Sequence, residues 1–424
     1  MRSRRLVPAL VLGLALALAL GACGSTVDGA APTRTTATAA PPTHRLADPA
    51  VVVATSDGMV SVRTATGQVG FRAPNGIVSP DRSTIVQAEA MTTGTRVVAS
   101  DAATGTVRWS HDVPGNRRVR VASPGGRFVA LVDGNLSYAA SPRATTTVDV
   151  ATATGAHRYR FAGNFDPEAF STDGHTLFVL DFLPAMKPTR YSVREVDLAS
   201  GAIRAVPDRD GSIRAPMPGY ALAQTMSPDG TQLYTFYASS EPISGDDGDQ
   251  YHAWIHVLNL QHKWAHCLEL DEDIGIQGGA NAALAVSADS KRLYVSDRLT
   301  GAFVSIDTAS LRATRTRFVR DLETSTGAVL AATGDALYAN AGPHGVVRLD
   351  ARTLEPDSGT FESSRAVLAL QVDRSGQALY VLATDGLFVV DPRGRVLERW
   401  AAPGSATSIA PSPMPGRGTY FCAC

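Results

Sequence analysis

Short apolar segments separated by turn-forming residues dominate the chain from residue 46 onward. The segments have the length of β-strands, are rich in Val, Leu, Tyr and Phe, and lie between clusters of Gly, Pro, Asp and Ser. Amphipathic helical periodicity is scarce in the same region. The pattern therefore predicts an all-β body of antiparallel strands joined by tight turns.

Two phrases recur along this body. The first is a small or Pro/Asp/Gly turn followed by a large apolar pair, and the second is an Asp or small residue ahead of a Thr-Gly-like turn. Asp caps such turns through its carboxylate and Gly supplies positive φ, so each phrase predicts a tight reversal between antiparallel strands. Copies of the first phrase span residues 79–88, 123–132, 171–180, 227–236 and 287–296, with weaker copies at 332–340, 373–382 and 412–421. Copies of the second span residues 64–69, 101–107, 149–157, 197–203, 259–264, 307–313, 350–356 and 391–396.

Two hairpins in every 40 to 60 residues define a four-stranded unit, and repeated units of this length predict a β-propeller. Residues 51–73 align with 379–401 as the last three strands of a blade, while 405–421 resemble the first strand or two of one. The two chain ends are therefore expected to share a blade and close the ring. This count favours eight blades, and seven blades with an irregular C-terminal extension is the alternative.

The repeats resemble a known family of propellers. The Leu-Tyr or Leu-Phe phrase and the Asp-x-x-x-Gly turn are similar to YVTN and YncE-like repeats over roughly residues 46–421. Residues 99–109 (ASDAATGTVRW) also resemble the repeat of quinoprotein-like propellers, in which the tryptophan docks between blades. Segment 391–400 is a looser copy, and the other turns lack the tryptophan. The resemblance implies the fold far more than any function.

The first 22 residues predict an export signal. Three arginines precede an apolar run over residues 6–20, which is too short to favour a permanent membrane span. Residues 20–23 (Leu-Gly-Ala-Cys) resemble the bacterial lipobox. The resemblance implies that Cys23 carries a lipid whose acyl chains include palmitate. The alternative is an ordinary secretory signal with an incidental cysteine.

Residues 23–45 are rich in Gly, Ser, Thr, Ala and Pro and predict a flexible linker, with a propeller domain over 46–424. A flexible linker of this length has a root-mean-square end-to-end distance of about 25 Å. We therefore expect a protein that is lipid-anchored to the extracytoplasmic face of the cell membrane. Loss of the signal lowers the net charge from −1 to −4, and no basic run occurs in the body, so nucleic acid is not an expected partner.

Three cysteines remain after Cys23, in a compartment that permits disulfides. Cys267 can pair with Cys422 or Cys424 and fix the C-terminus to the body. The alternative is three unpaired thiols, because connectivity cannot be deduced from sequence.

Five long connections fall in consecutive repeats, at residues 133–144, 181–190, 207–220, 238–251 and 268–281. In a four-stranded meander they all belong to one face of the ring, and long loops on a rigid scaffold are typical of a binding surface. Their chemistry suits a protein, a glycan or a small polar ligand, and the alternative is a set of tolerated insertions. The candidate ligand-binding residues are Tyr138, Phe182, Lys187, Arg209, Arg214, Asp246, Asp247, Asp249, Asp271 and Asp273.

Two groups of side chains have metal-ligand chemistry. The acidic pieces 246–249 and 271–273 offer carboxylates to Ca²⁺, although neither has the spacing of a calcium loop. The imidazoles and thiol of one hairpin offer a set for Zn or Cu: His252, His256, His262, His266 and Cys267. The alternatives are hydrated acidic loops and packing between blades.

Motifs for nucleophilic, zinc-hydrolase or phosphate-binding chemistry are absent from the sequence. The sequence therefore predicts a binding or interaction module rather than an enzyme, with no firmly predicted cofactor. The rival hypothesis is a propeller enzyme, either like a quinone-dependent dehydrogenase or like a lactonase, since propeller enzymes assemble their sites from separate blades. A structural envelope protein is a third hypothesis.

Overall fold

The computed structural model describes residues 46–136, 140–213, 215–244, 250–271, 273–275, 282–319, 322, 329–341 and 345–410. Within these ranges the chain forms eight antiparallel sheets of four strands each. The short 3-10 turn η1 (Pro124–Gly126) interrupts the β-structure once. No helix in the described ranges is long and apolar enough to cross a membrane.

Each sheet is one blade, whose strands follow one another from the ring axis outward. Blade 1 contains β32 (Ala406–Ile409), β1 (Ala50–Thr55), β2 (Gly58–Arg63) and β3 (Val69–Pro74). Blade 2 contains β4 (Ile77–Val78), β5 (Thr84–Met91), β6 (Gly94–Asp101) and β7 (Val107–Pro114). Blade 3 contains β8 (Arg117–Ala122), β9 (Val129–Asp133), β10 (Thr145–Thr152) and β11 (Gly155–Ala162). Blade 4 contains β12 (Asn164–Phe170), β13 (Thr176–Leu183), β14 (Arg190–Asp197) and β15 (Ile203–Ala205).

The second half of the ring repeats this plan. Blade 5 contains β16 (Tyr220–Met226), β17 (Gln232–Ser244), β18 (Gln250–Asn259) and β19 (Trp264–Glu269). Blade 6 contains β20 (Ala282–Val286), β21 (Arg292–Asp297), β22 (Ala302–Asp307) and β23 (Arg312–Phe318). Blade 7 contains β24 (Leu330–Ala332), β25 (Ala336–Ala341), β26 (Gly345–Asp350) and β27 (Pro356–Glu362). Blade 8 contains β28 (Val367–Val372), β29 (Leu379–Ala383), β30 (Gly386–Val390) and β31 (Val396–Trp400).

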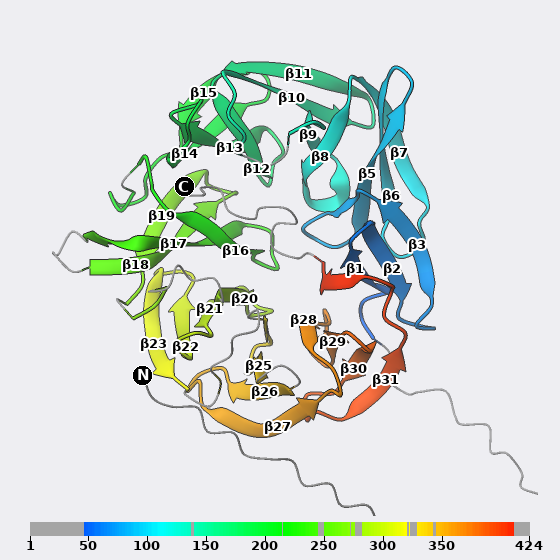
Figure 1. The fold of residues 1–424 in the computed structure, drawn as a ribbon, viewed down its shortest axis with the longest axis vertical. Coiled ribbons are helices and arrows are strands. Elements are labelled where there is room, and N and C mark those ends of the chain that lie inside the picture. The colour runs from blue at the N-terminus through cyan, green and yellow to red at the C-terminus, as the bar shows by residue number, and fades with distance from the viewer. Residues whose placement is uncertain are drawn as a thin grey trace, which may run out of the picture. The chain divides into compact units, whose positions relative to one another are not determined.

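The two ends of the propeller meet in blade 1, as the partial repeats predict. The C-terminal strand β32 pairs antiparallel with β1, so that Ile409 lies opposite Val53 and Ala406 opposite Thr55. Figure 1 shows the red strand β32 beside the blue strands of blade 1. This pairing closes the ring and confirms eight blades.

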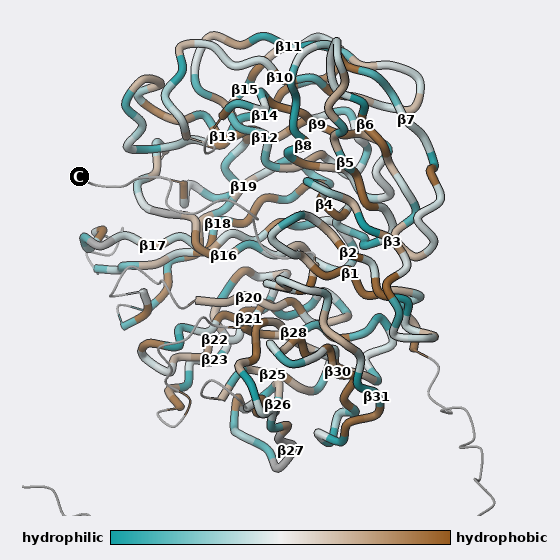
Figure 2. The backbone as a smooth tube through the Cα atoms, turned by 45° about the vertical axis from the view of Figure 1, so that its right-hand side comes forward, coloured by the Kyte–Doolittle hydropathy of each residue, from teal (hydrophilic) through white to brown (hydrophobic). Residues whose placement is uncertain are grey.

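Burial explains why these segments form strands in this order. The second and third strands of a blade are covered on both faces by neighbouring blades, and every residue of β29 and β30 is buried. Fourth strands face solvent, and all three residues of β15 are exposed. Figure 2 shows the corresponding contrast between the hydrophobic β1 and the more hydrophilic β27.

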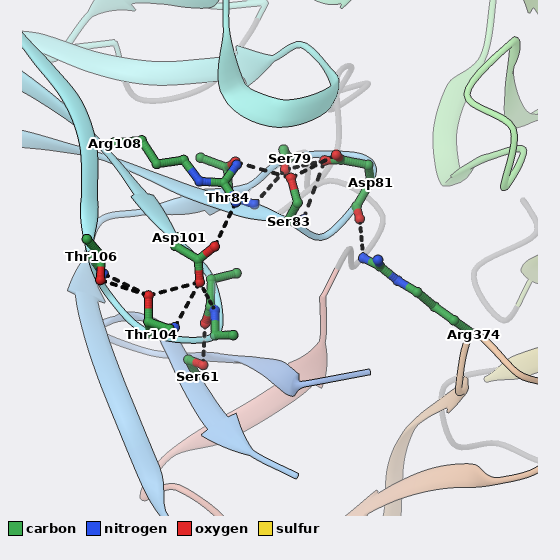
Figure 3. Close-up of polar contacts among 12 residues, drawn as sticks. Ser61, Ser79, Asp81, Ser83, Thr84, Asp101, Thr104, Thr106, Arg108 and Arg374 are labelled. Carbon is green, nitrogen blue, oxygen red and sulfur yellow. Dashed lines mark hydrogen bonds and ion pairs between the residues drawn. The ribbon is translucent and has the colours of Figure 1, made fainter. Parts of the chain in front are cut away.

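The first repeated phrase forms the turn between the first and second strands of a blade. In blade 2, the Ser79 hydroxyl donates to Asp81 Oδ1 at 2.6 Å and accepts the Thr84 backbone N–H at 3.0 Å (Figure 3). The same serine–aspartate contact recurs in blades 4, 5 and 6. Side-chain hydrogen bonds therefore replace the backbone bonds that the tight turn cannot make.

The second phrase forms the turn between the third and fourth strands. Asp101 Oδ1 accepts the backbone N–H groups of Ala103 and Thr104 at 3.0 and 2.9 Å, while Arg108 donates to its other oxygen (Figure 3). Gly105 follows with φ of 75°, a backbone conformation that favours glycine. The turn chemistry predicted from sequence is therefore the chemistry that the structure uses.

Tryptophan side chains dock between blades where the sequence resembles the quinoprotein-like repeat. Trp109 on β7 donates its indole N–H to the Gly126 carbonyl of blade 3 at 3.0 Å. Trp400 on β31 packs so closely on Gly67 of blade 1 that the glycine has no room for a Cβ atom. Both fourth-strand tryptophans thus join one blade to the next.

The ring has two different faces. Turns from the first to the second strand and from the third to the fourth strand lie on what we call the tight-turn face. Connections from the second to the third strand, and crossings to the next blade, lie on the opposite, long-connection face. Every long connection predicted from sequence belongs to the second class.

Candidate functional site

The chain joins the ring at a buried ionic cluster on the tight-turn face. Asp48 is only 2% exposed and forms an ion pair with Arg374, whose Nε lies 3.0 Å from Asp48 Oδ1. Arg82 Nη1 lies 3.9 Å from Asp48 Oδ2. The Asp48 carbonyl accepts the Thr64 hydroxyl at 2.6 Å, and the neighbouring Ala47 N–H donates to Asp373. Burial raises the pKa of Asp48, and the two arginines partly offset that rise. The cluster ties the start of the propeller to blades 1, 2 and 8.

On the opposite face, the first two long connections are bound to each other. The buried Asn164 on β12 donates its amide to the carbonyls of Ser141 and Ala185, at 3.1 and 3.0 Å. The Arg143 backbone N–H also donates to the Ala185 carbonyl at 3.3 Å, and its Nε donates to the Thr146 hydroxyl at 3.0 Å. Residues 140–144 and 184–189 are therefore held on the same scaffold.

A buried ion pair joins the first strands of the same two blades, blades 3 and 4. Arg120 on β8 donates to Asp166 on β12 through Nε at 2.8 Å and through Nη2 at 2.6 Å. Asp166 is fully buried, so the pair fixes blade 3 against blade 4 rather than presenting charge to a ligand.

We call the crossing from blade 4 to blade 5, residues 206–219, the strap. It begins near the tight-turn face because β15 has only three residues, and it then follows the outer edge of β19. The Ala265 N–H donates to the Pro207 carbonyl at 2.9 Å, and the Cys267 N–H donates to the Ser212 hydroxyl at 3.0 Å. Met217 then pairs with Tyr191 on β14. The strap thus covers the gap between the two blades.

A pocket of about 250 Å³ lies beneath the strap, between blades 4 and 5. Most of its wall is apolar, and its polar groups come from Ser192, Arg194 and His256. Arg194 pairs with Asp181 at 3.4 Å. Ligand pockets usually measure about 300 to 1,000 Å³. This pocket therefore lies just below the usual range for ligand pockets.

Three of the predicted ligand-binding residues lie on the long-connection face as expected. Lys187 is exposed in the connection after β13, and Asp271 and Asp273 are exposed in the crossing after β19. Asp271 accepts the Thr316 hydroxyl at 2.9 Å. Five predicted residues and the predicted lipidation site Cys23 lie outside the described residues; the five are Tyr138, Arg214, Asp246, Asp247 and Asp249.

Two predicted ligand-binding residues have other positions. Phe182 is 1% exposed and packs in a core cluster with Tyr191 and Met217, because β13 continues through Leu183. Arg209 stacks over Trp264 at 5.0 Å and contacts the Ala309 carbonyl, which places it at the outer edge toward the tight-turn face. The predicted connection 238–251 is also shorter than expected, since β17 and β18 extend until only residues 245–249 separate them.

The predicted imidazole cluster does not form. His252 lies 3.4 Å from the Ser239 carbonyl, His262 is exposed in the turn beyond β18, and His266 pairs with Asp210 at 2.9 Å. Among the residues that the structure describes, no three His, Cys, Asp or Glu side chains come together as metal ligands. Strand alternation places His266 on the sheet face opposite to His256 and Cys267, and His262 lies in the turn, so the five side chains do not converge.

Two members of the predicted metal set are nevertheless neighbours. His256 on β18 lies directly opposite Cys267 on β19. Cys267 is a free thiol, and its predicted disulfide partners Cys422 and Cys424 lie outside the described residues. Glu272 is also outside them, so Ca²⁺ binding at either acidic piece stays a prediction.

Several residues that organise this side of the ring were not singled out by sequence. Asn164 and Met217 belong to neither repeated phrase. Neither residue gives a distinguishing sequence signal, since the strand that begins at Asn164 also contains Asp166 and Glu168. Both act through contacts between blades, which no local pattern encodes.

Comparison of the sequence with protein-family models finds no match, and comparison with curated proteins finds none either. Comparison of the fold with solved structures does find similar chains. Dihydro-heme d1 dehydrogenase NirN in complex with DHE is similar over 87% of this chain and 76% of its own, with 14% identity and a TM-score of 0.51. BamB from Moraxella catarrhalis is similar over 78% of this chain and 86% of its own, with 14% identity and a TM-score of 0.45. At this identity the likeness shows the propeller fold alone.

Proposed function

We propose that this chain is a lipid-anchored binding module of the bacterial cell envelope, and that its long-connection face binds an extracytoplasmic protein. The lipid is attached at Cys23, and residues 24–45 connect it to the propeller. The module binds its partner without catalysing a reaction on it.

The observation that carries this proposal is the position of the buried cluster around Asp48. The propeller begins on the tight-turn face, where Arg374 and Arg82 hold that aspartate. The long connections lie on the opposite face. The described chain therefore enters the propeller on the face opposite to the long connections, which is the arrangement that suits a tethered binding module.

The chemistry of the exposed connections supports a protein partner. Met186 is 60% exposed beside the exposed Lys187, and Asp271 and Asp273 provide negative charge in another connection. Protein interfaces combine such apolar and charged groups, with methionine enriched and water at the rim. Hydrogen bonds from Asn164 hold two connections in place, which reduces the entropy that a partner must overcome.

The anchor is tested by replacing the lipidation site. In cells that receive an alkyne analogue of palmitate, we expect Cys23→Ser to abolish labelling of the chain and to move it from the membrane fraction to the soluble fraction. A lipid chain contributes about 0.8 kcal/mol per buried CH₂, so its loss removes the main attachment.

Cys267→Ser is the matched control, because it removes a thiol from the folded body and leaves the signal region unchanged. We expect the control to retain both label and membrane association. Membrane association of Cys23→Ser equal to that of the parent chain would contradict the anchor.

A further inference from the structure

Two sulfur atoms meet beneath the strap. The Cys267 thiol on β19 and the Met217 thioether on the strap are 3.6 Å apart. Met217 is 3% exposed and lines the pocket between blades 4 and 5. A metal ion bonded to both sulfurs at about 2.3 Å would have them about 100° apart, which is close to a tetrahedral angle.

An imidazole with an unpaired ring nitrogen lines the same pocket. His256 is 4% exposed, and its buried Nε2 atom makes no hydrogen bond. Buried polar atoms are almost always paired, so the unpaired Nε2 of an imidazole in the pocket that Met217 also lines is available to a ligand. Because His256 lies directly opposite Cys267 on the neighbouring strand, the two side chains share one face of the sheet.

From this juxtaposition we propose that Cys267, Met217 and His256 form a binding site for copper(I). A thiolate, a thioether and an imidazole are the ligands that this soft ion prefers. The site is independent of the proposed partner-binding function, since it lies between two blades and needs no partner. Bound copper joins the strap to β18 and β19 and so links blade 4 to blade 5.

The charge of the site selects a monovalent ion. One thiolate neutralises one positive charge, so the copper(I) site is neutral overall, whereas a divalent ion leaves a net positive charge in an apolar pocket.

The binding step conserves atoms and electrons. The S–H bond of Cys267 breaks, its proton passes to solvent, and a bond forms between Sγ and copper, which stays in the +1 state. The Met217 and His256 bonds are dative and release nothing. One proton is therefore released for each ion bound.

The test uses the full chain carrying Cys23→Ser, Cys422→Ser and Cys424→Ser, so that Cys267 is its only thiol. Copper(I) is added without oxygen, in competition with the chromogenic chelator bicinchoninate. We expect one copper(I) per chain, and X-ray absorption showing two sulfur ligands and one nitrogen ligand. Adding Cys267→Ser should abolish binding, and adding Met217→Leu or His256→Gln should weaken it at least about tenfold.

His262→Gln is the matched control, because that imidazole is exposed and outside the pocket. It should bind copper(I) with unchanged affinity, and near-ultraviolet circular dichroism establishes that each variant is folded. Failure of the parent variant to retain copper(I), or unchanged affinity in the His256→Gln and Met217→Leu variants, overturns the site. Zn²⁺ binding as tight as copper(I) binding overturns the assignment to a monovalent ion.

Discussion

Asp173, in the turn between β12 and β13, is a single carboxylate whose ionisation is coupled to folding. Burial opposes its ionisation, but hydrogen bonds from the Ser171 hydroxyl, the His175 N–H and Lys263 outweigh burial and lower its pKa from 3.8 to about 2. Lys263 Nζ lies 3.1 Å from Asp173 Oδ2 and belongs to the turn between β18 and β19 in blade 5. Because the folded pKa lies below the unfolded one, this stabilisation is complete above about pH 4 and is lost as the pH falls toward about 2.

We therefore predict that Asp173→Asn lowers the free energy of unfolding by about 1 kcal/mol at pH 6, a value reduced for the partial exposure of this side chain. Asn keeps an acceptor oxygen, so the variant tests the charge. Urea unfolding of both proteins between pH 2 and pH 6 should show the difference disappearing near pH 2. A difference that is constant over that range would contradict the coupling.

At this scale, the sequence predicts turn residues well and buried site residues poorly. Asp101 and Gly105 act within a few residues of their own position, so the local phrase is sufficient to identify them. Phe182 falls within the predicted connection 181–190, but β13 extends through it, and the strap and Tyr191 cover its side chain. Strand alternation predicts the sheet face on which a side chain lies. Whether that side chain is buried depends on a segment distant in sequence, which alternation does not predict.

The closing strand β32 shows what can be predicted for a whole element. The alignment of 51–73 with 379–401 indicates that blade 1 lacks its first strand, and 405–421 is the remaining candidate. The extension of β17 to Ser244 was not predicted, because it depends on cross-strand pairs such as Ile243 with Tyr251. A missing repeat unit is visible in sequence, whereas a longer hairpin within one unit is not.

We predict that ending the chain after Ser405 destabilises the propeller by about 3 kcal/mol or more. The truncation removes the buried Ile409 and the hydrogen bonds that β32 makes to β1, and it leaves β1 as an open edge. The control ends after Ala410 and keeps all of β32. Thermal unfolding should show a lower midpoint only for the shorter chain. Equal midpoints would show that the ring does not depend on this pairing.

For the whole molecule, the central claim of the proposal is that a partner binds the long-connection face, opposite to the face on which the chain enters the ring at Asp48. The eight-bladed ring and its two classes of connection follow from repeat counting and meander topology. The position of Asp48 could not be predicted, because its partners Arg82 and Arg374 come from blades 2 and 8. Only closure of the ring brings these three side chains together.

Site-specific photo-crosslinking in intact cells tests this claim most directly. A photoreactive amino acid is placed at Lys187 or Asp271 on the long-connection face, and in matched variants at Thr66 or Lys291 on the tight-turn face, all exposed positions. We predict one protein adduct of the same size from Lys187 and Asp271, and none from Thr66 or Lys291. That adduct formed from the tight-turn positions, or no adduct from Lys187 and Asp271, would contradict the account.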